Sequence, residues 1–553
     1  MRWTGSWPGP STHWPVRREG MEREVDIAIV GYGPVGQVLA ALLGRAGHRV
    51  AVFERFRDIY RQPRAVHIDH EIMRLLQALD LAEHLAAEMI PLREYRWFGA
   101  DGEPLLTLTP ETPAKSGWEP GYLFFQPDVE RKLDRLVCGH DCVEVNRGWV
   151  AEGLVAEVDA ATLTLRRHHD DRDGRTVPTE ETREVTARWV IGADGANSFV
   201  RESAGIPRRD LGFRERWLVV DVEPDDVAAL AELPIACQWC SPRRPTTHVQ
   251  SGPRHRRWEF MLLPGETEED FEDPARVWSL LEPWFEPGDG RLVRSTVYEF
   301  RSMLAERMRD DRVLLVGDAA HLTPPFLGQG LCAGLRDAVN VSWKLDLVLR
   351  GLAPDELLGT IDAERQPQTR WFVEFAIELG KVLCELDLDA ATERDAALRQ
   401  ANGPPPVEAP PLADGVVRSQ PERADDPLAG TLAVQGTVAS DDRTGRFDDA
   451  VGGGWTLIAA GGDPREHLPD EQREALDALD VTVASLDSGA PGGVTDVDGR
   501  LTEWLGRHGA HAVLVRPDFY VFGSVASPAG LPSLVDDLRG RLALTTQPLI
   551  KEQ

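Results

Sequence analysis

Three glycines near the start of the chain have the spacing of a phosphate-binding turn. Gly31, Gly33 and Gly36 follow the apolar run at 25–30 and precede a stretch of small and apolar residues. The first glycine permits a tight turn, the second lets a pyrophosphate approach the backbone, and the third lets a helix pack on a strand. Glu54 ends the next apolar run, at about the 20-residue separation where an acidic side chain binds ribose hydroxyls. The pattern predicts a dinucleotide-binding unit.

A second stretch with chemical potential runs from 311 to 351. A short apolar run leads into a loop that contains Asp318, two prolines and Gly328, and a long helical pattern then ends at Arg350 and Gly351. A strand that feeds a glycine-rich turn at a helix start forms an anion-accepting site from backbone N–H groups and the helix dipole. Taken alone, the stretch is equally compatible with an ordinary strand–loop–helix connection, so the rest of the chain decides between the two.

Other charged and polar residues occupy similar turns. Asp194 and Gly195 follow an apolar run, which repeats the theme of a strand, a glycine turn and a carboxylate. Arg64 lies in a basic turn and is a candidate partner for a pyrophosphate, the alternative being a solvated arginine. Gln126 precedes Pro127, which is typical of the first turn of a helix.

Composition narrows the class of protein. The 553 residues are enough for roughly three domains, and the formal net charge of -30 argues against broad contact with nucleic acid or anionic lipid. No apolar run approaches the ~18 residues of a membrane helix, and six cysteines in so long a chain favour a cytoplasmic location. Cys237 and Cys240 have C-x-x-C spacing, but their context indicates a strand entering a turn, so no metal site is expected.

Four stretches, in order along the chain, resemble one family. They are GYGPVG with Glu54, PRAVHID, GADGANSFVR and GDAAHLTPPFLGQGLCAGLRDAVNVSWKL. Over about residues 21–400 the chain resembles the class A FAD-dependent aromatic hydroxylases, whose prototype is para-hydroxybenzoate hydroxylase. The middle segments RRWEFMLLPGETEED and CSPRRP are similar to those of the 3-(3-hydroxyphenyl)propionate hydroxylases, and the C-terminal region resembles that of the phenol-hydroxylase-like members.

This resemblance implies a place for each candidate residue along FAD. The ADP half, the flavin side, the motif linked to both FAD and nicotinamide, the ribityl chain and the isoalloxazine ring would be contacted in that order. The corresponding residues are Gly31, Gly33, Gly36, Glu54 and Arg64; Gln126; Asp194 and Gly195; Asp318; and Pro325, Gly328, Gly330 and Leu331.

The resemblance also implies a reaction. NAD(P)H reduces FAD, O2 adds to give a flavin C4a-hydroperoxide, and an OH group passes to a phenol such as 3-(3-hydroxyphenyl)propionate or 3-hydroxycinnamate, while the protein positions and shields the cofactor. The helix that starts near Leu331 would point its positive end at the N1–C2=O2 edge of the flavin. Two other functions stay open: an antibiotic- or polyketide-tailoring hydroxylase, and a flavin-binding protein without turnover.

A base near the phenol hydroxyl is expected because a phenolate reacts faster than a phenol. His67 is a candidate, although a packed histidine is the favoured interpretation, and His321 is expected to be structural. Four basic residues of the middle region are candidates to meet a substrate carboxylate or are otherwise solvated on a sheet face: Arg243, Arg244, His255 and Arg257.

The predicted fold class is α/β with α+β character. A Rossmann-like FAD-binding domain is interleaved with a sheet-rich substrate domain, and a thioredoxin-like domain that has no cysteine follows. The expected segments are 1–20, a disordered extension; 21–95, 120–205 and 302–400, the FAD-binding domain; 96–119 and 206–301, the substrate domain; 401–434, a linker; and 435–553, the C-terminal domain. The expected partners are FAD, O2, NADH or NADPH and a phenolic substrate, without nucleic acid or membrane; a homo-oligomer is left open.

Overall fold

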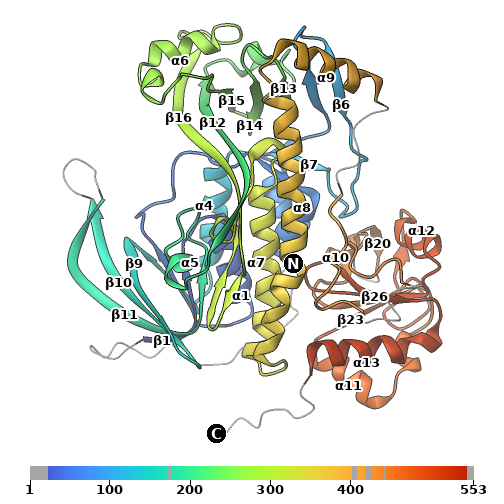
Figure 1. Cartoon of the computed structure of the whole chain (residues 1–553). Helices are drawn as coiled ribbons and strands as arrows, with labels where there is room; N and C mark the ends of the chain where they lie inside the picture. The colour runs from blue at the N-terminus through green and yellow to red at the C-terminus, as the bar shows by residue number, and fades with distance from the viewer. Residues whose placement is uncertain (1–22, 171–175, 402–407, 419–425, 441–442, 545–553) are drawn as a thin grey trace.

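The computed structural model describes residues 23–170, 176–401, 408–418, 426–440 and 443–544. The expected N-terminal extension at 1–20 lies outside these residues. Three bodies make up the molecule: a sheet flanked by helices, a second sheet above it, and a small C-terminal domain beside the two long helices α7 and α8 (Figure 1). Within the described ranges, no helix is both long and apolar enough to cross a membrane.

The first sheet has a parallel centre. Its order is β17-β18-β11-β1-β2-β8, and β1 pairs in parallel with both β11 and β2. Where the central strands pair in parallel, they are buried apolar runs because helices cover them. Their bounds are β1 Arg23–Val30, β2 Val50–Glu54, β8 Val143–Arg147, β9 Trp149–Ala156, β10 Ala161–Asp170, β11 Thr176–Gly192, β17 Arg309–Asp310 and β18 Val313–Leu315.

Helices at the carboxyl ends of these strands position the cofactor motifs. The helix α1 packs against both α7 and α4. The helix expected to begin near Leu331 and to end at Arg350 and Gly351 is α7, and its described bounds agree with that expectation. The helices are α1 Pro34–Arg45, α2 His70–Ala78, α3 Ala82–Ala86, α4 Gln126–Val137, α5 Phe199–Ser203, α7 Gly330–Leu349, α8 Thr360–Leu383 and α9 Leu388–Gln400.

The second sheet is almost entirely antiparallel and has the order β19-β16-β12-β15-β14-β13-β5-β6. The segment 91–120 supplies its last two strands, which are short and depend on pairing with the distant β13. The strands are β5 Tyr95–Phe98, β6 Pro104–Leu108, β12 Arg208–Pro224, β13 Ala236–Trp239, β14 Thr246–Ser251, β15 His255–Met261, β16 Gly290–Ala305 and β19 His321–Leu322, with α6 Pro274–Leu281 beside them. A small third sheet is formed by β3 His67–Asp69, β4 Ile90–Pro91 and β7 Gly121–Leu123.

The C-terminal domain has the thioredoxin-like layout. Its sheet has the order β23-β22-β25-β26, with β22 and β23 parallel and the last two strands antiparallel. A helix follows each of β22 and β23, and a third helix follows β26, so the chain order is βαβαββα. The elements are β22 Thr456–Ala459, α11 Asp470–Ala478, β23 Thr482–Ser485, α12 Arg500–Arg507, β25 Ala512–Val515, β26 Val521–Val525 and α13 Leu531–Leu542; β20 Thr437–Ala439, β21 Thr444–Arg446, α10 Phe447–Ala450 and β24 Thr495–Asp496 pack beside them.

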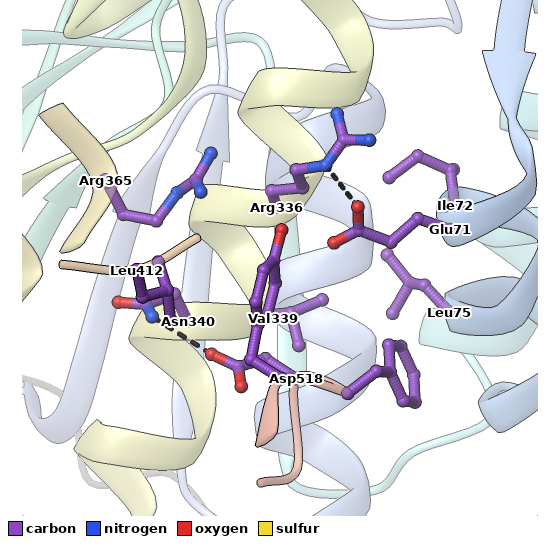
Figure 2. Close-up of a pocket in the computed structure, with 11 residues that line it drawn as sticks. Glu71, Ile72, Leu75, Arg336, Val339, Asn340, Arg365, Leu412 and Asp518 are labelled. Carbon is purple, nitrogen blue, oxygen red and sulfur yellow. Dashed lines mark hydrogen bonds and ion pairs between the residues drawn. The ribbon is translucent and has the colours of Figure 1, made fainter. Parts of the chain in front are cut away.

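Buried polar contacts join this domain to α2 and α7. Figure 2 shows Arg336 of α7 beside Glu71 of α2, and Asn340 beside Asp518 of the C-terminal domain; the two bonds measure 2.7 and 3.0 Å. The cavity that they enclose has a volume of about 10 Å³, which is room for about one water molecule. The described parts of the expected linker also pack here, where the backbone N–H of Val416 donates to Glu364.

Candidate active site

The glycine turn after β1 closes tightly on one side and is open on the other. A Cβ atom on Gly31, whose φ is +103°, would lie 2.3 Å from the carbonyl oxygen of Ala193, and one on Gly36 would lie 2.2 Å from that of Gly31. A Cβ atom on Gly33 would meet nothing within 4 Å. The first and third positions therefore need glycine for backbone packing, while the second leaves an open approach of the kind that a pyrophosphate uses.

Glu54 stands at the end of β2 beside this turn. Its carboxylate accepts hydrogen bonds from the backbone N–H groups of Tyr32 (2.8 Å) and Phe56 (2.9 Å). The Tyr32 hydroxyl in turn donates to Asp134 of α4 at 2.9 Å. These bonds fix the carboxylate next to Gly33, and the remaining lone pairs of Glu54 are available to ribose hydroxyls.

A cavity of about 690 Å³ lies between the glycine turn and the second sheet. The structure brings ten of the predicted site residues together in its wall. They are Gly33, Arg64, His67, Gln126, Gly195, Asp318, Pro325, Gly328, Gly330 and Leu331. Gly31, Gly36, Glu54 and Asp194 support the wall from outside rather than line the cavity.

Gln126 holds the turn that carries Arg64. Its side-chain oxygen accepts bonds from the backbone N–H groups of Arg64 (2.9 Å) and Ala65 (2.6 Å), and its amide nitrogen donates to Glu130 at 2.6 Å. Burial raises the pKa of Glu130 to about 7. The side chain of Arg64 is exposed and lies over the ring of Tyr60, so its guanidinium remains accessible at the mouth of the cofactor half.

The two aspartates of the glycine-containing turns have different surroundings. Asp194 accepts bonds from the Ser198 hydroxyl (2.5 Å) and the Val200 N–H (3.0 Å), and burial, the largest influence, raises its pKa. Asp318 is exposed at the cavity wall, while Arg208 donates to its backbone carbonyl at 2.5 Å. Asp194 therefore organises the turn around Gly195, and Asp318 offers a free carboxylate to a ligand.

The N-terminus of α7 faces the same cavity. Gly330 and Leu331 line it, and within the described chain no side chain caps this end of the helix. Asp337, about two turns further on, braces the preceding loop by accepting from the Gly317 N–H (3.0 Å) and by bonding His321 (2.6 Å). His321 therefore has a structural contact, as expected from the sequence, and the first amides of α7 remain open to an anionic group.

His67 lies at the end of the loop that follows Arg64. Its Nδ1 is 3.3 Å from the carbonyl oxygen of Gly328, and the ring borders the cavity. Burial lowers the pKa of His67, which favours the neutral imidazole. This contact joins the loop of Arg64 to the loop before α7. It is compatible with His67 as a packed residue and with His67 as a catalytic base.

The opposite wall belongs to the second sheet, and sequence reasoning missed most of its polar residues. Because alternate residues of a strand share a face, the register places them in rows across the sheet. The signal in the sequence is a polar residue at every second position of short strands, but the rows exist only once distant strands pair. One row contains Val219, Glu259, Thr247, Gln238 and Trp97, and the next contains Arg294, Asp221, Arg257, Val249 and Ala236.

Of the basic candidates in the middle region, only Arg257 lines the cavity. It is buried and paired with Asp221 at 2.7 Å. Arg244 pairs with Glu266 at 2.7 Å, His255 stacks on Phe125, and Arg243 is exposed. These three do not border the cavity.

The chain matches known proteins along most of its length. Residues 24–376 match the family model described as an FAD binding domain, and residues 430–541 match the HcaD C-terminal domain. A "probable NADH-specific resorcinol 4-hydroxylase" of Rhodococcus jostii (strain RHA1) is 38% identical over 530 residues, which cover 94% of this chain and 96% of the relative.

A second relative and a solved structure are also similar. A "3-(3-hydroxy-phenyl)propionate/3-hydroxycinnamic acid hydroxylase" of Escherichia coli O139:H28 (strain E24377A / ETEC) is 31% identical, with 96% of this chain and 97% of that protein covered. The crystal structure of the flavin-dependent monooxygenase PieE has a TM-score of 0.76 at 23% identity and covers 94% of this chain and 99% of that one. The open glycine turn, the uncapped helix and the large cavity fit an FAD molecule.

Proposed function

Because the chain belongs to the class A FAD-dependent aromatic hydroxylases, we propose that it hydroxylates the ring of an uncharged phenol, with NADH as reductant and O2 as oxidant. One observation carries the proposal. The cavity of about 690 Å³ is bounded by the cofactor motifs on one side and by a mixed polar and apolar sheet face on the other. A ring bound between these walls would meet the flavin directly.

The residues around the cavity suggest how FAD is held. Gly33, Glu54 and Arg64 suit the ADP half, Asp318 suits the ribityl chain, and the start of α7 suits the flavin edge that becomes negative on reduction. When bound, FAD supplies the redox chemistry, which is acceptance of two electrons from NAD(P)H and their delivery to O2. The protein orients the two partners and excludes water.

The charges of the cavity favour an uncharged substrate. Arg257 and Arg294 are the arginines of the sheet wall, and both lie beside Asp221, at 2.7 and 3.8 Å. Both also donate to the backbone carbonyl oxygen of Pro63, and the enclosed Nε of Arg294 has no partner among the described residues. A substrate carboxylate would find little compensation here, and burying an unpaired charge is costly. The name of the Rhodococcus relative points to the same class of substrate.

A phenol with a longer side chain is the second candidate, as the name of the Escherichia relative suggests. The far end of the cavity is apolar and passes between β6 and the helices α8 and α9. It is lined by Leu106, Leu108, Phe375, Leu379, Val382 and Leu398, with the exposed Glu378 among them. A substituent on the ring can extend in this direction, but a carboxylate there would face Glu378.

The test compares phenols on the purified, FAD-loaded protein. Resorcinol, 3-(3-hydroxyphenyl)propionate and 3-hydroxycinnamate are each scored by stimulated NADH oxidation and by product mass, with NADPH as the parallel reductant. We expect stimulation, a product heavier by one oxygen atom, and a kcat/KM that is higher for resorcinol. If every phenol fails to stimulate the oxidation of either nucleotide, the chain is a flavin-binding protein without this activity.

The glycine turn gives an independent test of the FAD site. Gly31→Ala places a Cβ atom against Ala193 and forces an alanine into φ +103°, so we expect the folded variant to lose FAD. Gly102→Ala is the matched control, since that glycine also has a positive φ but nothing lies within 4 Å of its added Cβ. Co-elution of flavin absorbance with each protein measures the difference. Full retention of FAD by Gly31→Ala would contradict the assignment.

A further inference from the structure

Glu259 is a buried carboxylate that faces the cavity from β15. It is 9% exposed, and within the described residues it accepts no hydrogen bond. Its nearest cation is Nη1 of Arg257, at 3.8 Å. Buried carboxylates in proteins are ordinarily hydrogen-bonded, so an unbonded one that opens on a cavity indicates a place for a ligand donor.

The neighbouring cations direct their described hydrogen bonds to groups other than Glu259. Arg257 donates to Asp221 through Nε at 2.7 Å, and to the carbonyl oxygens of Pro63 and Arg64 at 2.8 and 2.7 Å. Arg294 also donates to Pro63 and lies 3.8 Å from Asp221. The two guanidiniums therefore hold Asp221 and the loop of Arg64, and Glu259 keeps its acceptor capacity.

The two polar side chains in the middle of the row, Thr247 and Gln238, bond to each other. The Thr247 hydroxyl donates to the side-chain oxygen of Gln238 at 2.5 Å, and the amide of Gln238 donates to the Tyr95 hydroxyl at 2.5 Å. Trp97 ends the row with an indole N–H that is buried and has no partner among the described residues. Glu259 is thus the acceptor of this wall, and a phenol hydroxyl is a matching donor.

We propose that Glu259 binds the ring hydroxyl of the phenolic substrate and accepts its proton during hydroxylation. This inference rests on the proposed function and names the residue that activates the ring. The position explains why the carboxylate is buried without a hydrogen bond, since a bound phenol would supply the missing one. It also gives the expected base a different residue from His67, whose burial favours the neutral form and whose Nδ1 lies beside Gly328.

The step balances as follows. The phenol O–H bond breaks, its electron pair stays on the ring oxygen, and the proton moves to a carboxylate oxygen of Glu259. The phenolate donates electron density to its ortho and para carbons, and one of these gains an oxygen atom from O2. NADH supplies two electrons, the second oxygen atom leaves as water, and the displaced ring proton is released. Glu259 then returns its proton to the product, so the phenol, O2, NADH and H⁺ give a product with one hydroxyl more than the substrate, NAD⁺ and water.

Other charged groups around Glu259 set its titration. Burial raises the pKa of Glu259 above its ordinary value; Asp221 adds to this effect, while Arg257 and Arg294 oppose it. The reacting form is the carboxylate, so kcat/KM is expected to fall as the pH decreases through this raised pKa. The other titratable or charged side chains of the cavity wall are Arg64, His67, Tyr95, Tyr298, Asp318 and Glu378.

Glu259→Gln tests the role, because glutamine keeps the size but cannot take the proton. With resorcinol, we expect a fall in kcat/KM of about 10²–10⁴-fold and loss of its acid limb. We also expect NADH oxidation that yields hydrogen peroxide in place of product. Glu299→Gln is the matched control, since Glu299 is on β16 of the same sheet, pairs with Arg301 and does not border the cavity.

A second variant keeps the test decisive if Glu259→Gln does not fold. Glu259→Asp keeps a carboxylate, but its shorter side chain holds that group further from the substrate ring. Partial activity with a retained acid limb of the pH profile is therefore expected. Wild-type hydroxylation with an unchanged rate and pH profile in Glu259→Gln would overturn the role of Glu259 and leave the proposed function standing. If Glu259→Gln does not fold, a wild-type kcat/KM without an acid limb would overturn it. Absence of any phenol-stimulated NADH oxidation in the wild type would overturn the proposed function itself.

Discussion

Two buried clusters of charged side chains differ in how completely their members are paired. At the joint with the C-terminal domain, Glu364 of α8 lies 2.8 Å from Lys344 and 2.6 Å from Arg516, and Arg516 also lies 2.6 Å from Asp518. Lys344, Glu364 and Arg516 are fully buried. At the cavity, Asp221 has comparably close partners, but Glu259 has a cation only at 3.8 Å.

The difference separates a structural cluster from one that is completed by a ligand. A buried charge is tolerated when opposite charges and hydrogen bonds replace water, as around Glu364, where Lys344 and Arg516 hold the pKa of the carboxyl down at about 2. Around Glu259 burial is the largest influence, and it raises the pKa. In the first cluster the described charges lie within 2.8 Å of an opposite charge, whereas Glu259 has a cation only at 3.8 Å.

The largest effect is expected at the joint. Glu364→Gln would leave Lys344 and Arg516 buried with less compensation, so we expect a loss of ~3–5 kcal/mol in the free energy of unfolding. Denaturant unfolding measures it. Glu374→Gln on the exposed face of α8 is the matched control and should change stability by less than ~0.5 kcal/mol. Equal stability of the two variants would show that the joint cluster does not hold the domains together.

A smaller loss is expected from Asp221→Asn at the cavity. The variant removes the charge that compensates Arg257 and Arg294, but both arginines keep their bonds to the carbonyl oxygen of Pro63. We expect a loss of ~2–3 kcal/mol in stability. Weaker FAD retention should follow, because the loop that carries Arg64 is less firmly held. Thermal unfolding and flavin release measure the two effects, and a variant with wild-type values in both would contradict the idea that Asp221 organises this wall.

The sequence predicts the cofactor side of the site better than the substrate side, for a physical reason. The Gly31–Gly36 turn and the 311–351 stretch are local, since a strand, a turn and a helix follow one another along the chain. Glu259, Gln238 and Trp97 meet only because β15, β14, β13 and β5 pair in register, and that pairing joins segments up to about 160 residues apart. Short strands with mixed polarity give too weak a periodic signal to predict such a row.

Arg257 illustrates a second limit of prediction from the sequence. Its residue type suggested a contact with a substrate carboxylate, yet the fold engages its donors with Asp221 and the backbone of Pro63 and Arg64. A sequence shows that an arginine is present but not whether its hydrogen bonds are already used. The same holds for the acid Glu259, whose lack of a partner becomes visible only in three dimensions.

The smallest expected effect is the pH dependence of stability. Its direction is opposite for the two carboxyl groups, Glu364 and Glu259. The lowered pKa of Glu364 means that its contribution is present above the unfolded-state value of about 4.5 and is lost as the pH falls towards about 2. The raised pKa of Glu259 has the opposite consequence: the folded state is penalised when this carboxyl ionises, above its raised pKa, and the penalty disappears in acid. Glu259→Gln should therefore melt at or slightly above the wild-type temperature at pH 7, and this difference should vanish at lower pH.

Saturating resorcinol should raise the melting temperature of the FAD-loaded wild type more than that of Glu259→Gln, since only the carboxylate gains its missing donor. If Glu259→Gln melts well below the wild type at pH 7, the charge of Glu259 stabilises the fold, as that of Glu364 does.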